Sequence, residues 1–491
     1  MKRYLRIVSK NKGFTDLINQ NTEDSSFFLN SLLNHPKHTG KMMGKHIIRK
    51  NILKVDFKET ILIVSLYCFV AITSIINLGI IAGPVFLFLF LLCSLYKPRT
   101  GLIALLSMFY LPTGGINIPY IFVISTAIVA LMNLGAFTKI RGYRINGTLI
   151  VLYSVFLVLR FVSVTFVEDF ELFYSYFFVS FTVLIHLIVI SSLVENKEDI
   201  DCILLMWGII GALSALLGYV HYLMQDNTYL RQVVISTGAI DKSTLMGSLD
   251  YVRWIWAGAE PNFTGLQLLI PLAINFHFMF KYKRILNILT SLMTFLGILG
   301  TYSRSSFLVA LVVLFIYFLM IRSKVKYVVL VFTVASTFAI ITLFSEFADR
   351  INSIQETIEY EQGSGRFPLY EEALNNFWNN PLFGVGTGQT RLYSATHRES
   401  HNLFLQTLGE NGLLSFIVLI ILFYYHLKKA IAFRREKIVY IVAIIAIMLN
   451  ACTVSCFDMR VLITLFVLLN YEYYFRSYPQ QITKKNSYLS T

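Results

Sequence analysis

Long apolar runs separated by short polar turns fill most of the chain. A run of roughly 17 to 25 apolar residues crosses the hydrocarbon core of a bilayer as one α-helix, and such runs recur from Thr60 to Phe475. The pattern predicts about fourteen membrane spans, give or take about two. The predicted spans are 61–76, 80–96, 101–111, 120–137, 148–166, 173–194, 202–222, 262–280, 285–302, 305–321, 327–344, 413–427, 438–456 and 461–475.

Two longer polar segments, 223–259 and 345–411, interrupt the apolar pattern. We therefore expect an all-α polytopic membrane protein of about 12 to 14 transmembrane helices, with a large extracytoplasmic loop that contains short helices. The predicted organisation is a basic N-terminal segment at 1–59, a membrane domain at 60–475 and a tail at 476–491. Within the membrane domain, 223–259 is the first outer loop and 345–411 the second, which we expect to be catalytic.

Composition agrees with this class of protein. The 491 residues are 56% hydrophobic and 14% charged, and the mean hydropathy is +0.64. Ordinary soluble globular proteins contain roughly 25% charged residues. A soluble enzyme or binding module is therefore excluded as the class.

Basic residues fall on alternate loops. The clusters are Lys97 with Arg99, then 139–144, 281–284, 322–326 and 428–437. Because Lys and Arg near span ends stay on the cytoplasmic side, these loops and both termini are expected in the cytoplasm, and the two polar segments face outward. This bias also explains the net charge of +14 without a nucleic-acid partner.

The basic segment 1–59 carries twelve Lys and Arg against five Asp and Glu. It is too polar for a secretory signal peptide. Two interpretations stay open: a mostly disordered tail, or a surface anchor in which apolar patches such as 27–33 lie on the anionic inner leaflet.

Cysteine usage adds little chemistry. All five cysteines, at 68, 93, 202, 452 and 456, fall inside predicted spans. Cys452 and Cys456 are one helical turn apart, but no His or further Cys accompanies them, so they are typical of packing residues and not of metal ligands. We predict no disulfide on the outer face and no metal.

The outer face is where the chain concentrates polar chemistry. The stretch 327–427 contains no lysine but contains Arg350, Arg366, Arg391 and Arg398. A guanidinium grips a phosphate with two parallel hydrogen bonds, which favours Arg over Lys for this task. Two further arginines lie at predicted outer boundaries: Arg304 in the turn 301–305, and Arg253, which precedes Trp254 and Trp256.

Glycines gather at 363–365 and at 384–388. A Rossmann or P-loop site needs a preceding strand and a following helix in a cytosolic domain, and neither context is predicted here. A tight turn that brings backbone N–H groups toward an anion fits this outward loop better.

Four stretches follow one another along the chain: "RWIWAGAEPNFTG", "TYSRSSFLVAL", "GSGRFPLYEEALNNFWNNPLFGVGTGQT" and "SHNLFLQTLGENGLLSF". Together they resemble the signatures of the O-antigen ligase and Wzy-type polymerase superfamily. The resemblance covers 253–416, whereas the N-terminal half is similar to the family only in hydropathy.

The resemblance implies a membrane-embedded glycosyltransferase of the GT-C type. Such enzymes take a glycan from an undecaprenyl-diphosphate carrier on the outer face of the bacterial cytoplasmic membrane. They need no nucleotide sugar, cofactor or metal. A polymerase transfers the glycan to a second lipid-linked repeat unit, in capsule, O-antigen or exopolysaccharide synthesis, and a ligase transfers it to lipid A core, a protein or another surface acceptor. A chain-length regulator and a flippase are candidate protein partners.

The resemblance also implies which residues form the site. The expected catalytic residues are His401, Arg366, Arg304 and Glu410; the expected diphosphate or glycan contacts are Arg253, Arg366, Arg304, Asn402, Arg398 and Arg391. Breaking an anomeric bond to a diphosphate builds charge on the leaving group, which fixed cations stabilise. His401 is expected to contact the diphosphate or to orient the acceptor hydroxyl, with Glu410 and Glu399 as fallback general bases.

Structural interpretations of the same residues remain open. Arg304 would then snorkel to the surface, Arg253 would anchor the interface, and His401 would be a solvated residue at the start of a surface helix. We expect Ser400 to be the N-cap of that helix. His401 would then share a helical face with Leu405 and Leu408.

Three classes of function compete. We favour a polymerase over a ligase, because about fourteen spans are predicted. A transporter or flippase is the second class, but transporters place charges at mid-membrane, and most predicted spans here lack charge, Arg160 being the main exception. A membrane scaffold without activity is the third.

Overall fold

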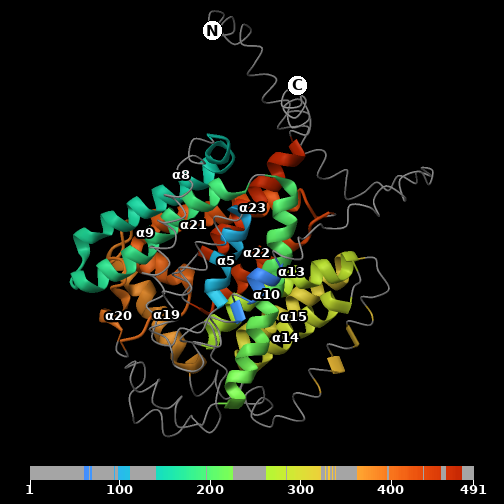
Figure 1. Ribbon diagram of the computed structural model, residues 1–491. Helices are drawn as coiled ribbons and strands as arrows, with labels where there is room; N and C mark the ends of the chain where they lie inside the picture. Colours follow the sequence, from blue (N-terminus) through green and yellow to red (C-terminus); the bar gives the residue numbers. More distant parts are fainter. Residues whose placement is uncertain are drawn as a thin grey trace, which may run out of the picture. The chain divides into compact units, whose positions relative to one another are not determined.

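The computed structural model describes twelve stretches of the chain and isolated positions between 327 and 338. The stretches are 60–65, 67–68, 93, 98–110, 140–194, 196–224, 261–282, 285–321, 362–394, 397–434, 436–454 and 460–477. Every regular element in these residues is a helix (Figure 1). The predicted segment 1–59, the span predicted at 120–137 and most of the outer segment 223–259 lie outside the described residues.

Among the described residues, five helices are long and apolar enough to cross a membrane. They are α8 (Ile140–Val162), α9 (Phe170–Leu193), α10 (Lys197–Met224), α13 (Pro261–Tyr282) and α21 (Leu403–Ile431). Shorter helices accompany them: α5 (Pro98–Ser107), α14 (Ile285–Gly300), α15 (Arg304–Met320), α22 (Val439–Ala451) and α23 (Arg460–Ser477). The predicted class, an all-α polytopic membrane protein, is confirmed, and the number of spans stays a prediction.

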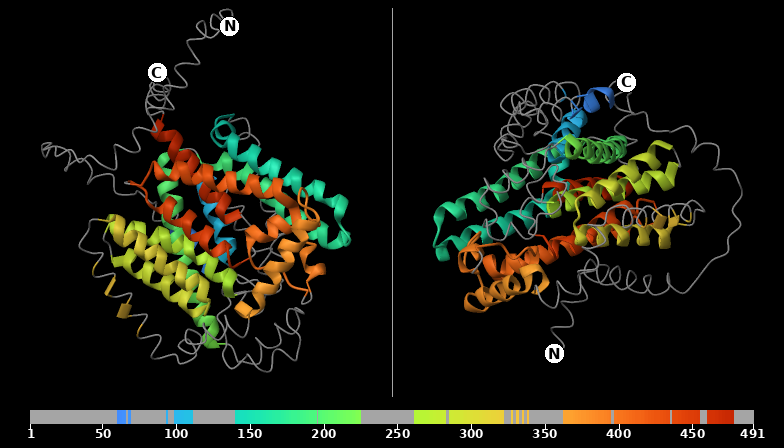
Figure 2. Two further views of the ribbon diagram at one scale, coloured as in Figure 1. Left: turned by 180° about the vertical axis from the view of Figure 1, so that it is seen from behind. Right: turned by 90° about the horizontal axis from the view of Figure 1, so that it is seen from below.

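Buried amide side chains join the central helices. Asn275 of α13 donates to the carbonyl oxygen of Gly208 in α10 at 2.9 Å and to Oγ1 of Thr294 in α14 at 3.0 Å. Such bonds hold helices together where lipid offers no hydrophobic driving force between them. Figure 2 shows α13, α14 and α15 as one group of helices, and α8 with α9 as a pair elsewhere in the bundle.

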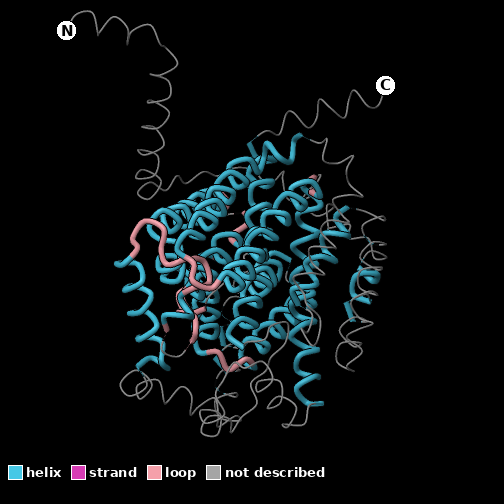
Figure 3. Tube along the Cα trace, turned by 90° about the vertical axis from the view of Figure 1, so that its left-hand side faces the viewer, coloured by secondary structure: helices cyan, strands magenta, loops and turns pink. Residues whose placement is uncertain are grey.

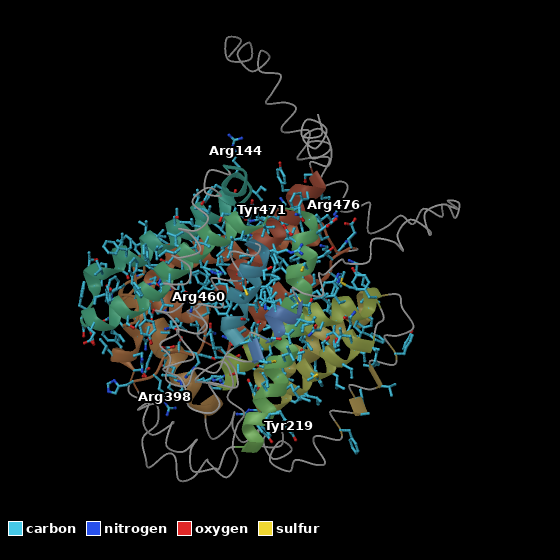
Figure 4. The ribbon with its side chains drawn as sticks, viewed as in Figure 1. Arg144, Tyr219, Arg398, Arg460, Tyr471 and Arg476 are labelled. Atoms are coloured by element: carbon cyan, nitrogen blue, oxygen red, sulfur yellow. The ribbon has the colours of Figure 1, made fainter. Side chains whose placement is uncertain are left out.

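Charged side chains tie the helix ends together at one end of the bundle. Buried Lys437, in the turn before α22, pairs with Asp201 of α10 at 2.6 Å and, more closely, with Glu472 of α23. Figure 4 shows Arg144 and Arg476 at this end and Arg398 at the opposite end. Arg144 and Lys437, from two of the basic loops, thus lie on one side together with Arg476.

The second polar segment folds into short helices at the other end. α19 (Gln362–Asn379) and α20 (Thr390–Tyr393) flank the glycine loop, and α19 packs on α21. Figure 3 shows that loops among the described residues are confined to short connections between helices. These elements position the candidate site.

Candidate active site

Helix α21 is broken at Gly412, which has φ +72° and ψ −174°. A Cβ atom built at Gly412 would lie 2.3 Å from the backbone of Leu382, so both the positive φ and the close approach require glycine. Beyond the break, the N–H of Leu413 donates to the carbonyl oxygen of Pro381 at 2.8 Å. The Asn-Pro loop therefore supplies the hydrogen-bond acceptor that the interrupted helix lacks.

The glycine loop also satisfies the carbonyl groups before the break. The N–H of Val385 donates to the carbonyl oxygen of Gly409 at 3.0 Å, and the N–H of Gly386 donates to that of Glu410 at 2.9 Å. A helix end buried without such partners would be costly. The loop and the broken helix thus form one hydrogen-bonded unit.

This loop meets the side chain of Glu410. Glu410 is 1% exposed, and its carboxyl group accepts hydrogen bonds from Oγ1 of Thr390 and Nε2 of Gln406, both at 2.8 Å. The backbone N–H of Gly388 also donates to it. The turn that was predicted to bring N–H groups toward an anion stays a prediction as far as a bound anion is concerned. These contacts favour a positioning role for Glu410.

Arg160 of α8 is the main charged residue expected inside a span. It is 4% exposed, interacts electrostatically with Glu410 and lies over the ring of Phe156 at 5.6 Å. The carbonyl oxygen of Arg160 accepts from Oγ1 of Thr387 at 3.2 Å. A buried charge in a membrane protein needs such partners, and Glu410 with the ring supplies them.

Gln389 fixes the glycine loop to the turn between α8 and α9. This buried side chain accepts from the N–H groups of Glu168 and Asp169 at 3.1 and 2.9 Å, and donates to the carbonyl oxygen of Asp169 at 2.8 Å. A Cβ atom at Gly388 would lie 2.8 Å from the ring of Tyr176. Sequence reasoning missed Gln389, because its partners lie about 220 residues away.

His401 stands in a strained backbone conformation, with φ +49°. Non-glycine residues in this region are uncommon, and they cluster at functional sites. The next residue, Asn402, caps α21: its Oδ1 accepts from the N–H groups of Phe404 and Leu405 at 3.0 and 3.1 Å. His401 is half-buried directly before this cap.

The prediction that Ser400 caps α21 is wrong. Asn402 is the N-cap, and the Ser400 hydroxyl donates to the Asn402 carbonyl oxygen at 3.2 Å. Because α21 begins at Leu403, His401 lies outside the helix. The helical face that it was predicted to share with Leu405 and Leu408 therefore does not exist.

Tyr370 joins two of the predicted site residues. Its hydroxyl forms hydrogen bonds with the side chains of Arg366 and Asn402 and donates to the carbonyl oxygen of Cys452 at 3.4 Å. Burial raises the pKa of Tyr370, although Arg366 and Asn402 act in the opposite direction, so the phenol is neutral at physiological pH. Sequence reasoning missed Tyr370; its position one helical turn after Arg366 was the available signal.

Arg304 begins α15 and lies half-buried after the N-cap Ser303. Oγ of Ser306, one turn into this helix end, accepts from Nδ2 of Asn450 at 3.0 Å. Asn450 lies in the last turn of α22, and the carbonyl oxygen of Cys452, the C-cap residue of this helix, accepts from the Tyr370 hydroxyl. The start of α15 and the group of Arg366, Tyr370 and Asn402 thus adjoin the same end of α22.

Arg391 and Glu399 meet on Tyr176 of α9. Arg391 donates to the tyrosine hydroxyl at 3.2 Å, and that hydroxyl donates to Glu399 through a short hydrogen bond. Burial opposes the charge on Arg391, but Tyr176 and Glu399 outweigh it and raise the pKa of Arg391. Arg398 is exposed at the same end of the bundle (Figure 4). Arg253 lies outside the described residues.

In the described part of the chain, no group of three or more His, Cys, Asp or Glu side chains is placed to hold a metal ion. The metal-independent reaction expected from the sequence stays a prediction.

The fold and this group of side chains define a class: an all-helical membrane protein with a polar, arginine-containing site at one end of its bundle. One family model matches the region of the chain that contains this site. Residues 289–420 match the model described as O-antigen ligase, Wzy_C, which confirms the family resemblance seen in the motifs. The match contains Arg304, Arg366, His401 and Glu410. A search of curated proteins found no match.

Proposed function

We propose that the protein is a membrane glycosyltransferase that joins undecaprenyl-diphosphate-linked repeat units into surface polysaccharide. The family match supports a ligase-type or polymerase-type role in surface polysaccharide assembly. One observation carries the proposal. Arg366 and Asn402, from two of the family-like motifs, meet at Tyr370, next to strained His401.

The reaction is a displacement at an anomeric carbon. An acceptor hydroxyl forms the new C–O bond while the bond from the sugar to the lipid diphosphate breaks, and the bonding electron pair leaves with the diphosphate. Arg366, with Arg304, stabilises the charge that develops on this leaving group. Tyr370 positions Arg366 through its neutral hydroxyl. Arg253 is proposed as a further diphosphate contact.

The acceptor must also lose a proton. We assign His401 to contact the diphosphate or to orient the acceptor hydroxyl, because it precedes the cap of α21 and is held in an unusual backbone conformation. Glu410 is enclosed by protein donors, so we assign it to positioning. Glu399, which is half-buried and bonded to Tyr176, is the alternative base.

The proposed orientation places this site on the outer face of the cytoplasmic membrane. Arg144 and Arg476 lie at the opposite end of the bundle (Figure 4), and Lys and Arg near span ends stay cytoplasmic. The donor is therefore proposed to be a glycan that has already been moved across the membrane on its lipid carrier.

Two substitutions separate a transferase from the other classes. His401→Ala and Arg366→Ala should abolish the surface polymer while intact lipid-linked repeat units accumulate on the outer face. Arg434→Ala, which removes an exposed arginine at the basic end, should leave polymer unchanged. Loss of outward repeat units would indicate a flippase, and unchanged polymer in both variants would indicate a scaffold.

Ligation is the second candidate, favoured by the description of the matching family model, O-antigen ligase. The predicted number of spans favours polymerisation. The two are distinguished by the acceptor: a polymerase lengthens the lipid-linked repeat unit with no other acceptor present. A ligase leaves that unit unchanged until lipid A core or another surface acceptor is added.

A further inference from the structure

Helix α19 carries an exposed apolar stripe. Phe367, Leu374 and Trp378 follow at spacings of seven and four residues, which places them on one helical face, and they are 50%, 37% and 71% exposed. Leu382 follows just after the helix and is 54% exposed. Large exposed apolar patches mark contact surfaces, so this stripe of Phe367, Leu374, Trp378 and Leu382 calls for a partner.

The opposite face of α19 is buried against α21. Leu369, Ala373 and Asn376 are buried. α19 packs on α21 so closely that a Cβ atom at Gly409 would lie 2.8 Å from the carbonyl oxygen of Ala373. Arg366 and its partner Tyr370 project between this buried face and the apolar stripe, by helical spacing. The stripe therefore borders the proposed diphosphate site.

The stripe continues into the exposed surface of a membrane span. On α21, the described residues before Gly412 are buried or half-buried, and large exposed side chains begin at Leu413, Leu414 and Ile417. Leu413 is bonded through its N–H to Pro381, the residue before Leu382. The surface that α21 presents to lipid thus adjoins the stripe at Leu382. The exposed Glu371 lies on the same face of α19, between Phe367 and Leu374.

The break also fixes how deep α19 reaches. Gly412 follows the first residue of α21 by about nine positions, which is roughly 13 Å along the axis. The 29 residues of α21 measure about 43 Å, whereas the hydrocarbon core of a bilayer is about 30 Å thick. The part of α21 before Gly412 therefore exceeds the length that the core needs, which places the break, and the end of α19 beside it, near the core boundary. Residues 384–390 of the loop are buried in protein.

We propose that α19 lies along the membrane boundary and that its stripe contacts the acyl chains of the leaflet on the site's side. Trp378 suits this place because its amphipathic ring favours the membrane interface. A second step rests on the proposed function: a diphosphate carried by a lipid would reach Arg366 sideways from the leaflet, along the stripe, and not from the water.

Fluorescence quenching tests the contact without any substrate. The full-length protein and its Trp378→Phe variant are placed in nanodiscs of ordinary or brominated phospholipid, and the difference between them reports Trp378. Brominated lipid should remove most of this signal, and aqueous acrylamide little of it. Quenching mainly by acrylamide would overturn the proposal, as would protection from both quenchers, which would show a protein partner or a second copy on the stripe.

Tryptophans at two other positions test whether brominated lipid quenches every exposed tryptophan of the protein equally. Leu392→Trp, made with Trp378→Phe, moves the reporter to an exposed position on α20, where acrylamide should quench more than brominated lipid. Phe367→Trp, made in the same background, moves it along the stripe and should restore quenching by brominated lipid. If both variants gave the same quenching ratio, the stripe would have no special contact and the proposal would fail.

Substrate length tests the second step. Trp378→Asp should raise the KM for a donor on a full-length polyprenyl chain several-fold, and should leave the KM for a short-chain, water-soluble donor unchanged. An equal rise for both donors would refute sideways entry, even with lipid contact established. If the parent protein turned over neither donor, the proposed function would fail while the quenching result stood.

Discussion

Replacing Glu410 with Gln separates positioning from proton transfer at the site. The side chain accepts hydrogen bonds from Thr390, Gln406 and the N–H of Gly388, and it interacts with buried Arg160. An amide keeps the shape but loses the charge, and its NH2 group conflicts with at least one donor. Hydrogen bonds to charged groups contribute about 1.5 to 3 kcal/mol, and removing one partner of a buried pair costs about 3 to 5 kcal/mol.

We therefore expect Glu410→Gln to lower the free energy of unfolding by about 2 to 4 kcal/mol. The assay is denaturant unfolding in lipid–detergent micelles, with Glu371→Gln, on an exposed carboxylate of α19, as the control that changes little. Adding Arg160→Met to this variant should recover part of the lost stability, because the double variant no longer buries an arginine without its charged partner. A double-mutant cycle showing no coupling between Glu410 and Arg160 would refute this account.

Activity gives the second half of the same test. Per folded molecule, Glu410→Gln should retain most of its turnover with an unchanged pH profile. A general base would instead lose roughly 100- to 10,000-fold. A loss of that size in folded protein would restore Glu410 as the base and contradict the positioning role.

Three further changes have defined outcomes. Gly412→Ala should lower the Tm strongly, because the φ of +72° and the backbone atom 2.3 Å from an added Cβ exclude a side chain. Gly147→Ala is the control and should leave the Tm nearly unchanged, because the space around Gly147 is open. Similar melting curves for the two variants would contradict the broken helix. Tyr370→Phe should reduce kcat/KM about three- to tenfold. Tyr393→Phe, which loses a hydrogen bond to Glu168, should leave kcat/KM unchanged. Equal kinetics for the two variants would show that Tyr370 has no role in the site. Lys437→Met should destabilise the fold by about 3 to 5 kcal/mol, measured by unfolding, and an unchanged stability would show that its two buried ion pairs contribute little.

The apolar pattern alone located most of the described helices. The spans predicted at 262–280 and 305–321 agree within a few residues with α13 and α15, because an apolar run in lipid has little choice except a helix. α21 begins ten residues before its predicted start at 413. Its first part contains Gln406, Glu410 and Asn411. From the sequence alone, polar residues of this kind predict a solvent-exposed segment, because their buried hydrogen-bond partners are not visible in the pattern.

Those partners lie elsewhere in the sequence. Asn411 donates to Thr387 at 2.7 Å, and Glu410 accepts from Thr390, so burial of the polar turn depends on a loop about 20 residues upstream. The contact of Tyr370 with Asn402 has the same character. An aromatic residue in an amphipathic helix is typical of packing, and its hydroxyl acquires a role only through tertiary contact.

The helix cap shows a smaller limit. Ser400 and Asn402 are both favourable N-cap types, and sequence preference does not choose between them. The backbone of His401, at φ +49°, turns the chain so that Asn402 takes the cap. The motif singled out this turn, but its geometry depends on the fold.

Reconstitution with a purified lipid-linked repeat unit tests the central claim most directly. The protein in proteoliposomes, given this donor alone, should produce a ladder of lengthened lipid-linked products, and His401→Ala or Arg366→Ala should leave the donor unchanged although the variants remain folded. A donor that stays unchanged with the parent protein, even after lipid A core is added as acceptor, would contradict the assignment of a glycosyltransferase.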